Sequence, residues 1–165
     1  LLKHDINLFA YHLPLDIHPS LGNNAQLAAR LGVSDIQNLE AGNYSIALKG
    51  VFTPPITPQA LAARLQQVLG KVPLFEQVEK ELINTVAWCT GGGQKYIDLA
   101  ANEGIDAFIT GEVSEQTIHT AREMNIHFYA AGHHATERFG AQAVGEYLAS
   151  QFDLEVDFID IANPA

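Results

Sequence analysis

The sequence predicts one α/β domain, with a mostly parallel sheet covered by helices on both faces. Along the second half of the chain, apolar runs typical of strands alternate with segments typical of helices. The expected strands are residues 84–89, 106–110 and 126–131, and the expected helices are residues 94–102, 114–124 and 133–150. This alternation predicts βαβ units, in which neighbouring strands run parallel. The length of 165 residues suits a single domain with a core, so residues 1–165 are treated as one α/β region.

The other strands are predicted from apolar runs bounded by turn-forming residues. They are residues 6–13, 45–53 and 154–159. Pro14 follows the first run and the pair Pro54-Pro55 follows the second. Because proline cannot donate a hydrogen bond to a neighbouring strand, we expect both strands to stop at these prolines.

Two helices in the first half are predicted from the residues at their ends. Asn23 or Asn24 is expected to cap the first helix, which Gly32 closes after Leu31. The second helix starts at the Thr57-Pro58 pair, a cap followed by proline at the first helical position, and stops at a glycine. These signals predict helices over residues 24–31 and 58–69.

Composition excludes several classes of protein. The formal net charge of −10 at pH 7 argues against nonspecific binding to nucleic acid or to an anionic membrane, but it allows a nucleotide-sized substrate. Cys89 is the only cysteine, so no intrachain disulfide can form, which fits a reducing cytoplasm. No apolar stretch of about 18 residues and no basic signal peptide is visible. We therefore expect a cytoplasmic protein with no membrane partner.

The segment AGHHATERFG, which runs from a strand end into a helix, is the most informative part of the chain. His133 and Glu137 are four residues apart, so on a helix they share one face. An imidazole beside a carboxylate suits zinc, iron, manganese or nickel better than calcium or magnesium. The alternative is an ordinary polar first turn, in which the helix dipole favours Glu137. His134 points about 100° away and is expected to be a neighbour of the site rather than a ligand.

Two more polar turns follow strands and should meet at the same edge of the sheet. The turn Thr90-Gly91-Gly92-Gly93 either makes a tight connection or presents backbone N–H groups to a phosphate. Glu112, beside Ser114, either belongs to the start of a helix or serves as a general acid or base near the metal. One shared site is therefore expected at this edge.

The segment YHLPLDIHP holds two further candidates. Asp16 lies just past the first predicted strand, where it is either a metal ligand or a turn-forming residue. His12, inside that strand, is either a packed histidine or a group near the metal. His18, His119 and His127 are expected to be structural or exposed, and Cys89 is expected to be inert core.

Several motifs together resemble the bacterial GTP cyclohydrolase I type 2-like family, also called the Nif-three-like family. They are HLPLDIHPSLGNNAQLA, VAWCTGGGQKYIDLA, DAFITGEVSEQTIHTARE, HFYAAGHHATERFG and the tail FIDIANPA. The resemblance runs from Asp5 to Ala165. Because the chain lacks an initiating methionine and enters a predicted strand after about five residues, we expect it to be the C-terminal two-thirds of a longer protein of this family.

The resemblance implies an α/β subunit of a toroidal homohexamer with two divalent metal ions per subunit. Matched by motif, Asp16, His133 and Glu137 are the implied ligands, with Glu137, or Asp16, bridging or flanking the ions. The family also uses a His-His pair from an N-terminal strand end, and this chain has no such pair. The implied ligand set is therefore incomplete here.

The resemblance further implies a metal-dependent hydrolase acting on a nucleotide-like substrate, in which a metal-bound hydroxide attacks a purine-like ring. Glu112 and His12 are the expected groups for proton transfer or orientation, and Gly91, Gly92 and Gly93 are the candidate phosphate site. The alternative is a metal-binding or regulatory scaffold without turnover, because a fold does not determine a reaction.

Overall fold

The computed structural model describes residues 1–40 and 45–163 of the chain. Its centre is one six-stranded sheet with the strand order β1-β2-β4-β5-β6-β3. The strands are β1 (Ser34–Asn38), β2 (Leu48–Ile56), β3 (Leu74–Glu76), β4 (Ile83–Cys89), β5 (Ala107–Thr110) and β6 (His127–Ala130). Only the pairs β4–β5 and β5–β6 are parallel, whereas the other three pairs are antiparallel. The α/β class is confirmed, but the sheet is mixed rather than mostly parallel.

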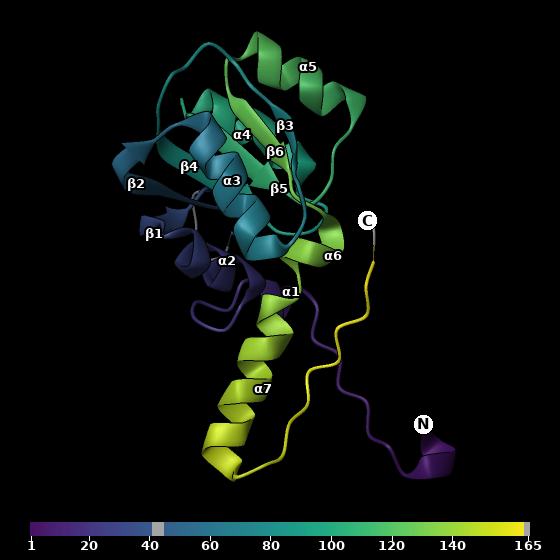
Figure 1. Cartoon of the computed structure of the whole chain (residues 1–165). Helices are drawn as coiled ribbons and strands as arrows, with labels where there is room; N and C mark the ends of the chain where they lie inside the picture. Colours follow the sequence, from purple (N-terminus) through teal and green to yellow (C-terminus); the bar gives the residue numbers. More distant parts are fainter. Residues whose placement is uncertain (41–44, 164–165) are drawn as a thin grey trace.

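Helices cover both faces of the sheet, as predicted (Figure 1). One core cluster joins α2 (Asn23–Leu31) and α3 (Pro58–Leu69) to one face, and the other joins α4 (Ile97–Asn102) and α5 (Glu115–Glu123) to the opposite face. Along β4, Trp88 packs in the first cluster and Cys89 in the second. On β6, Tyr129 packs in the first cluster and Phe128 in the second. Because both faces are covered, β5 and β6 are buried along their whole length, which explains their continuous apolar sequences.

The predicted helix ends are confirmed where the chain carries capping chemistry. The Thr57 side chain accepts a hydrogen bond from the Ala60 N–H at the start of α3. Ser114 and Thr117 form a reciprocal capping box at the start of α5. Gly32 closes α2 with φ of 69°, in the left-handed region that glycine occupies without strain. The residue that begins α2 differs from the prediction, since Gly22 takes the cap position and Asn23 is the first helical residue.

Two predicted strands are wrong. Residues 6–13 are extended and exposed up to the single-turn helix α1 (Leu13–Asp16), and residues 154–159 follow α7 (Phe139–Phe152) as an exposed extended segment. Neither run pairs with another strand in the described part of the chain, and several of their apolar side chains, such as Phe9 and Ile159, are largely exposed. Figure 1 shows the C-terminal segment returning from the far end of α7 toward α6, whereas the N-terminal end of the chain lies away from the sheet. The tail motif of the sequence ends at residues 164 and 165, which lie outside the described residues.

Three other details depart from the expected elements. The strands β1 and β3 were not predicted, because β1 is polar and mostly exposed and β3 has three residues. The pair Pro54-Pro55 does not end β2, because the register shifts between Val51 and Ile56 and removes the prolines from the ladder. The helix predicted over residues 133–150 is broken at Glu137 into α6 (His133–Thr136) and α7.

The remaining elements are the short 3₁₀ turns η1 (Leu2–His4) and η2 (Gln94–Tyr96). Among the described residues no helix is long and apolar enough to cross a membrane.

Candidate metal centre

The three polar turns meet at one edge of the sheet, as the alternation of strands and helices predicted. Gly111 N–H donates to the Gly91 carbonyl at 2.8 Å, and Gly132 N–H donates to the Gly111 carbonyl at 3.0 Å. A Cβ atom on Gly111 would lie 2.6 Å from both the Gly91 oxygen and the His133 Cα. The absence of a side chain therefore allows three consecutive turns to pack directly against one another, which places His133 beside the turn after β4.

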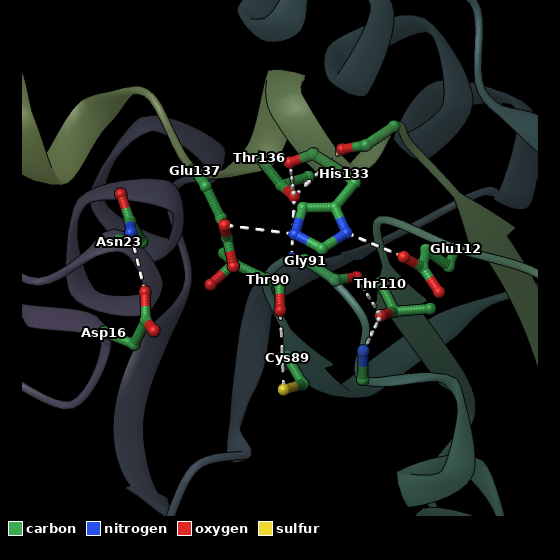
Figure 2. Close-up of polar contacts among 12 residues, drawn as sticks. Asp16, Asn23, Cys89, Thr90, Gly91, Thr110, Glu112, His133, Thr136 and Glu137 are labelled. Atoms are coloured by element: carbon green, nitrogen blue, oxygen red, sulfur yellow. Dashed lines mark hydrogen bonds and ion pairs between the residues drawn. The ribbon is translucent and has the colours of Figure 1, made fainter. Parts of the chain in front are cut away.

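His133 lies between two carboxylates, one on each side of its ring (Figure 2). Its Nδ1 donates to Glu112 Oε1 at 2.7 Å, and its Nε2 lies 3.2 Å from Glu137 Oε2. The hydrogen bond to Glu112 raises the pKa of His133. Glu112 also accepts a hydrogen bond from Gln94 Nε2 at 3.1 Å, so both of its oxygens are engaged. The bonds from His133 and then Gln94 lower the pKa of Glu112.

A carboxylate on Nδ1 selects the orientation of the imidazole. With its proton on Nδ1, the ring presents the lone pair of Nε2 on the side of Glu137. Histidine ligands of metals are commonly held in this way by a carboxylate on the other ring nitrogen. Glu112 is therefore placed to orient His133, and Gln94 is placed to orient Glu112.

Glu137 follows the single turn of α6 and packs against the turn after β4. A Cβ atom on Gly91 would lie 2.0 Å from Glu137 Oε1, so only glycine leaves room for this carboxylate. Burial raises the pKa of Glu137, and the nearby negative charge of Asp16 raises it further. The two carboxylates thus repel one another across a partly buried space, and a cation between them would relieve that repulsion.

Asp16 reaches the site from α1, where it is buried. Asn23 Nδ2 donates to Asp16 Oδ1 at 2.7 Å, and Asn23 Oδ1 accepts from the Gly140 N–H at 2.7 Å. Asn23 therefore ties Asp16 to the first turn of α7. His12 is exposed at the start of α1, outside any strand, and its positive form lowers the pKa of Glu137.

The glycine turn after β4 uses most of its backbone donors within the protein. Thr90 N–H donates to Asn24 Oδ1, Gly91 N–H to Thr136 Oγ1 and Gly93 N–H to Thr110 Oγ1, each at 3.0 Å. This arrangement favours the tight connection over a phosphate cradle, because three of the four N–H groups in Thr90-Gly91-Gly92-Gly93 already have partners.

The residues on this edge fit one side of a metal site. His133 Nε2 and Glu137 converge with the nitrogen and oxygen chemistry of a transition-metal ligand pair, and Asp16 is close enough to shift the pKa of Glu137. Over residues 1–40 and 45–163, however, no group of three or more His, Cys, Asp and Glu side chains is arranged to hold an ion. The described chain therefore offers a partial ligand set.

A cleft of about 860 Å³ opens beside the His133–Glu137 pair. Its walls include Lys71, His134, Arg138 and the terminal segment with Asp160. His134 lines this cleft, with Nε2 3.5 Å from Asp160 Oδ1, which agrees with the expectation that it neighbours the site.

The remaining candidates have structural or surface positions, as expected. His127 is fully buried, with Nδ1 accepting from Val78 N–H and Nε2 bonded to the Lys80 carbonyl. His119 lies on the exposed face of α5, and His18 accepts backbone N–H groups in the loop before α2. Burial raises the pKa of Cys89 to about 12, so its thiol is inert at neutral pH.

Four polar side chains of the site were missed by sequence reasoning: Asn23, Gln94, Thr110 and Thr136. Each bonds across a long stretch of sequence, from 17 residues for Thr110 to 117 for Asn23. The Gln94–Glu112 and Gly93–Thr110 bonds had a signal in the sequence, since both join two polar turns that were expected at the same edge.

Comparison with known proteins identifies the family. The profile of Duf34/NIF3 (NGG1p interacting factor 3) matches residues 1–164. The chain belongs to the Duf34/NIF3 family. It is 62% identical over its whole length to a protein of Pasteurella multocida named GTP cyclohydrolase 1 type 2 homolog, and 55% identical to the homolog of Escherichia coli K12. In both cases the chain spans 66% of the relative's length.

Solved structures of the Duf34/NIF3 family share the fold. A structure described as protein ybgI, of unknown function, is 55% identical and superposes with a TM-score of 0.93, covering 99% of this chain and 65% of that one. The protein TTHA1606 from Thermus thermophilus is 32% identical with a TM-score of 0.86, covering 99% of this chain and 64% of that one. The resemblance inferred from the motifs is thus confirmed at the level of the family.

Proposed function

We propose that this chain supplies Asp16, His133 and Glu137 to a dinuclear metal centre of a hydrolase that acts on a nucleotide-like substrate. The observation that carries the proposal is the Glu112–His133–Glu137 arrangement, in which one carboxylate orients the imidazole and the other converges with its Nε2. The nitrogen and oxygen donors favour zinc, iron, manganese or nickel. A pair of such ions supplies an activated water and stabilises charge on the attacked group.

The residues of the chain have separable roles in this proposal. Glu112 orients His133 rather than transferring protons, because both of its oxygens accept hydrogen bonds. His12 is exposed at the start of α1 and is electrostatically coupled to Glu137, so it is the candidate for proton transfer. Asn23 holds Asp16 toward the site by its hydrogen bonds to Asp16 and to Gly140.

The size of the cleft and the relatives support the substrate class. A volume of about 860 Å³ lies in the range of small-molecule sites and accommodates a nucleotide. The curated relatives carry the name GTP cyclohydrolase 1 type 2 homolog. We extend the same proposal to a homohexamer, because large apolar side chains of the terminal segments are exposed and need a covering surface.

A non-catalytic metal-binding scaffold is the second candidate. It is favoured by the partial ligand set, since no three candidate ligands within the described ranges are arranged around one point. The two proposals share the metal and differ in turnover.

Metal binding tests the shared part. We expect His133→Ala to weaken Zn²⁺ binding at least ten-fold in a chelator competition, whereas His119→Ala, an exposed histidine on α5, should leave it unchanged. Equal affinities in the two variants would remove His133 from the site. Turnover of GTP by the metal-loaded chain that is lost in His133→Ala would select the hydrolase, and full metal occupancy without turnover of any nucleotide would select the scaffold.

A further inference from the structure

The cleft beside the candidate metal centre has a second polar wall, formed by basic side chains. Arg138 Nη1 lies 2.6 Å from Asp160 Oδ2, and His134 Nε2 lies 3.5 Å from Asp160 Oδ1. The carboxylate of Asp160 is thus held with one oxygen toward each of these side chains. Asp160 belongs to the tail motif of the chain, to which no role was assigned from the sequence.

Lys71 brings another basic group to the same cleft. It follows the glycine that ends α3, and its side chain lies along Gly132, where a Cβ atom would come within 3.1 Å of Nζ. Gly132 immediately precedes His133, so the ammonium group stands at the start of α6, in the cleft that Arg138 also lines. Three basic side chains, from the end of α3, from α6 and from the start of α7, therefore line one cleft.

The Arg138 guanidinium has donor capacity beyond its present bonds. Its Nη2 donates to the Leu69 carbonyl at 2.9 Å, which fixes its position. Its Nε is buried and has no hydrogen-bond partner among the described residues, and neither has His134 Nε2. A buried donor without a partner is costly, so a ligand oxygen that satisfied it would bind favourably.

The Asp160 carboxylate belongs to a terminal segment that forms no strand in the described part of the chain and that contacts α7 through Val156. Residues 154–163 are extended and exposed, and within the described ranges they pair with no strand. Ile159 and Ile161, on either side of Asp160, are 79% and 73% exposed. An external anion can therefore compete with Asp160 for its partners at a small structural cost.

We propose that this cleft binds a phosphoryl-bearing ligand. Lys71 and Arg138 hold its phosphoryl group, and the rest of the ligand extends toward His133 and Glu137. In the free protein, Asp160 occupies the place of the phosphoryl group. A phosphoryl group has three terminal oxygens and up to two charges, so it engages Lys71 as well as the Arg138 guanidinium, whose Nη1 now holds the Asp160 carboxylate. The assignment rests on the proposed function for the reacting end of the ligand, and it places the phosphoryl group at Lys71 and Arg138 rather than at the glycine turn, which does not line this cleft.

The test measures binding by the chelator-treated chain, so that no metal contributes. The probes are inorganic phosphate, guanosine monophosphate and guanosine, and isothermal titration calorimetry gives their affinities. We expect the two phosphoryl-bearing probes to bind and guanosine to bind at least ten-fold more weakly. Guanosine binding as tightly as its monophosphate, or no binding of either phosphate probe, would overturn the proposal.

Two variants and a control locate the phosphoryl group. Lys71→Met should weaken binding of both phosphate probes about ten-fold, the effect of losing one charge-assisted hydrogen bond. Asp160→Asn should strengthen binding several-fold, because the competing charge is removed. Lys95→Met, an exposed lysine outside the cleft, should change nothing.

Two results with these variants would overturn the proposal. If Asp160→Asn weakens binding, or Lys71→Met matches Lys95→Met, the Asp160 contacts only anchor the tail and the proposal fails. Thermal unfolding of each variant shows whether the fold is retained. If Lys71→Met unfolds, the same binding test is made with Arg138→Lys, which keeps the positive charge and removes the planar guanidinium group. Phosphate binding that survives while Zn²⁺ binding fails would overturn the metal centre alone, and the reverse would overturn this subsite alone.

Discussion

The parallel core and the two terminal segments all carry strand-like sequences, but they have different structures. Residues 107–110 and 127–130 are mostly apolar and form fully buried strands, whereas the mostly apolar residues 6–13 and residues 154–159, in which apolar and acidic side chains alternate, remain extended and exposed. The difference is the presence of a neighbour, because a strand is stabilised by hydrogen bonds and side-chain pairs with another strand. Local sequence can specify an extended backbone, but the partner decides whether it becomes part of a sheet.

The same contrast divides the candidate site. Glu112, His133 and Glu137 stand on turns that follow buried strands, so packing holds their backbone in place. Asp16 and Asp160 come from segments next to the exposed termini, and each depends on a few polar bonds to reach the site. The following four predictions test this division, beginning with the largest effect.

The strongest test replaces the same residue type in each region. Phe108→Ala should lower the free energy of unfolding by about 4 kcal/mol, because Phe108 is fully buried on β5 and its loss leaves a cavity. Phe9→Ala should change it by less than about 0.5 kcal/mol, because Phe9 is 76% exposed. Urea denaturation measures both. Similar values for the two variants would mean that the N-terminal segment is as well packed as the core.

Asp106 should stabilise the parallel core in a pH-dependent way. Burial tends to raise the pKa of Asp106, but hydrogen bonds from Thr85, Lys80 and Asn84 outweigh it and hold the pKa below its ordinary 3.8. The stabilisation is therefore present above pH 3.8 and is lost as the pH falls through the lower folded-state pKa. Asp106→Asn should cost about 2 kcal/mol at pH 7.

The difference between wild type and Asp106→Asn should shrink in acid, which urea denaturation at several pH values measures. Asp98→Asn is the control, since Asp98 accepts one exposed hydrogen bond from Thr120. A pH-independent difference would show that the charge of Asp106 contributes nothing.

Glu112→Gln tests whether the turn after β5 orients His133 for metal binding. We expect Zn²⁺ affinity to fall about ten-fold, because the imidazole of His133 loses the carboxylate that orients it. Glu115→Gln, three residues further on and 93% exposed, should bind Zn²⁺ as the parent chain does. If both variants keep the parent affinity, the Glu112–His133 bond has no role in metal binding.

The smallest effect on folding is expected in the terminal segments. Ile161→Ser should change the free energy of unfolding by less than about 0.5 kcal/mol, because its side chain is 73% exposed. It should nevertheless reduce self-association in analytical ultracentrifugation if the segment is covered in the proposed hexamer. The matched control is Val72→Ser, which is 67% exposed and lies outside the segment. Unchanged association in Ile161→Ser would place the subunit contacts elsewhere.

The elements that could be predicted are those specified by neighbouring residues. The Thr57-Pro58 start of α3 and the Ser114 cap of α5 depend on contacts within one turn, and the sequence contains both partners. The buried strands β4, β5 and β6 were predicted because each is a short apolar run that a turn ends. By contrast, β1 is polar because it is an exposed edge strand, and its sequence carries no such signal.

In the candidate site, too, only the contacts between neighbouring residues could be predicted from the sequence. His133 and Glu137 meet although α6 has one turn, because an i, i+4 spacing requires no longer helix. The pairing of His133 with Glu112, and of Asp16 with Asn23, depends on the tertiary packing of separate elements. Such contacts are set by the whole fold, and no local pattern predicts them.

Gly91 positions a candidate ligand through its shape alone, because it has no side chain and no charge. Its lack of a side chain leaves the space in which the Glu137 carboxylate rests, and a single added methyl group would displace that carboxylate. Gly91→Ala would therefore displace a candidate ligand, and strain the backbone at φ of 65°, while every ionisable group and the net charge of −10 stay as they are. Such a variant distinguishes what the arrangement of the carboxylates does from what their charge alone does.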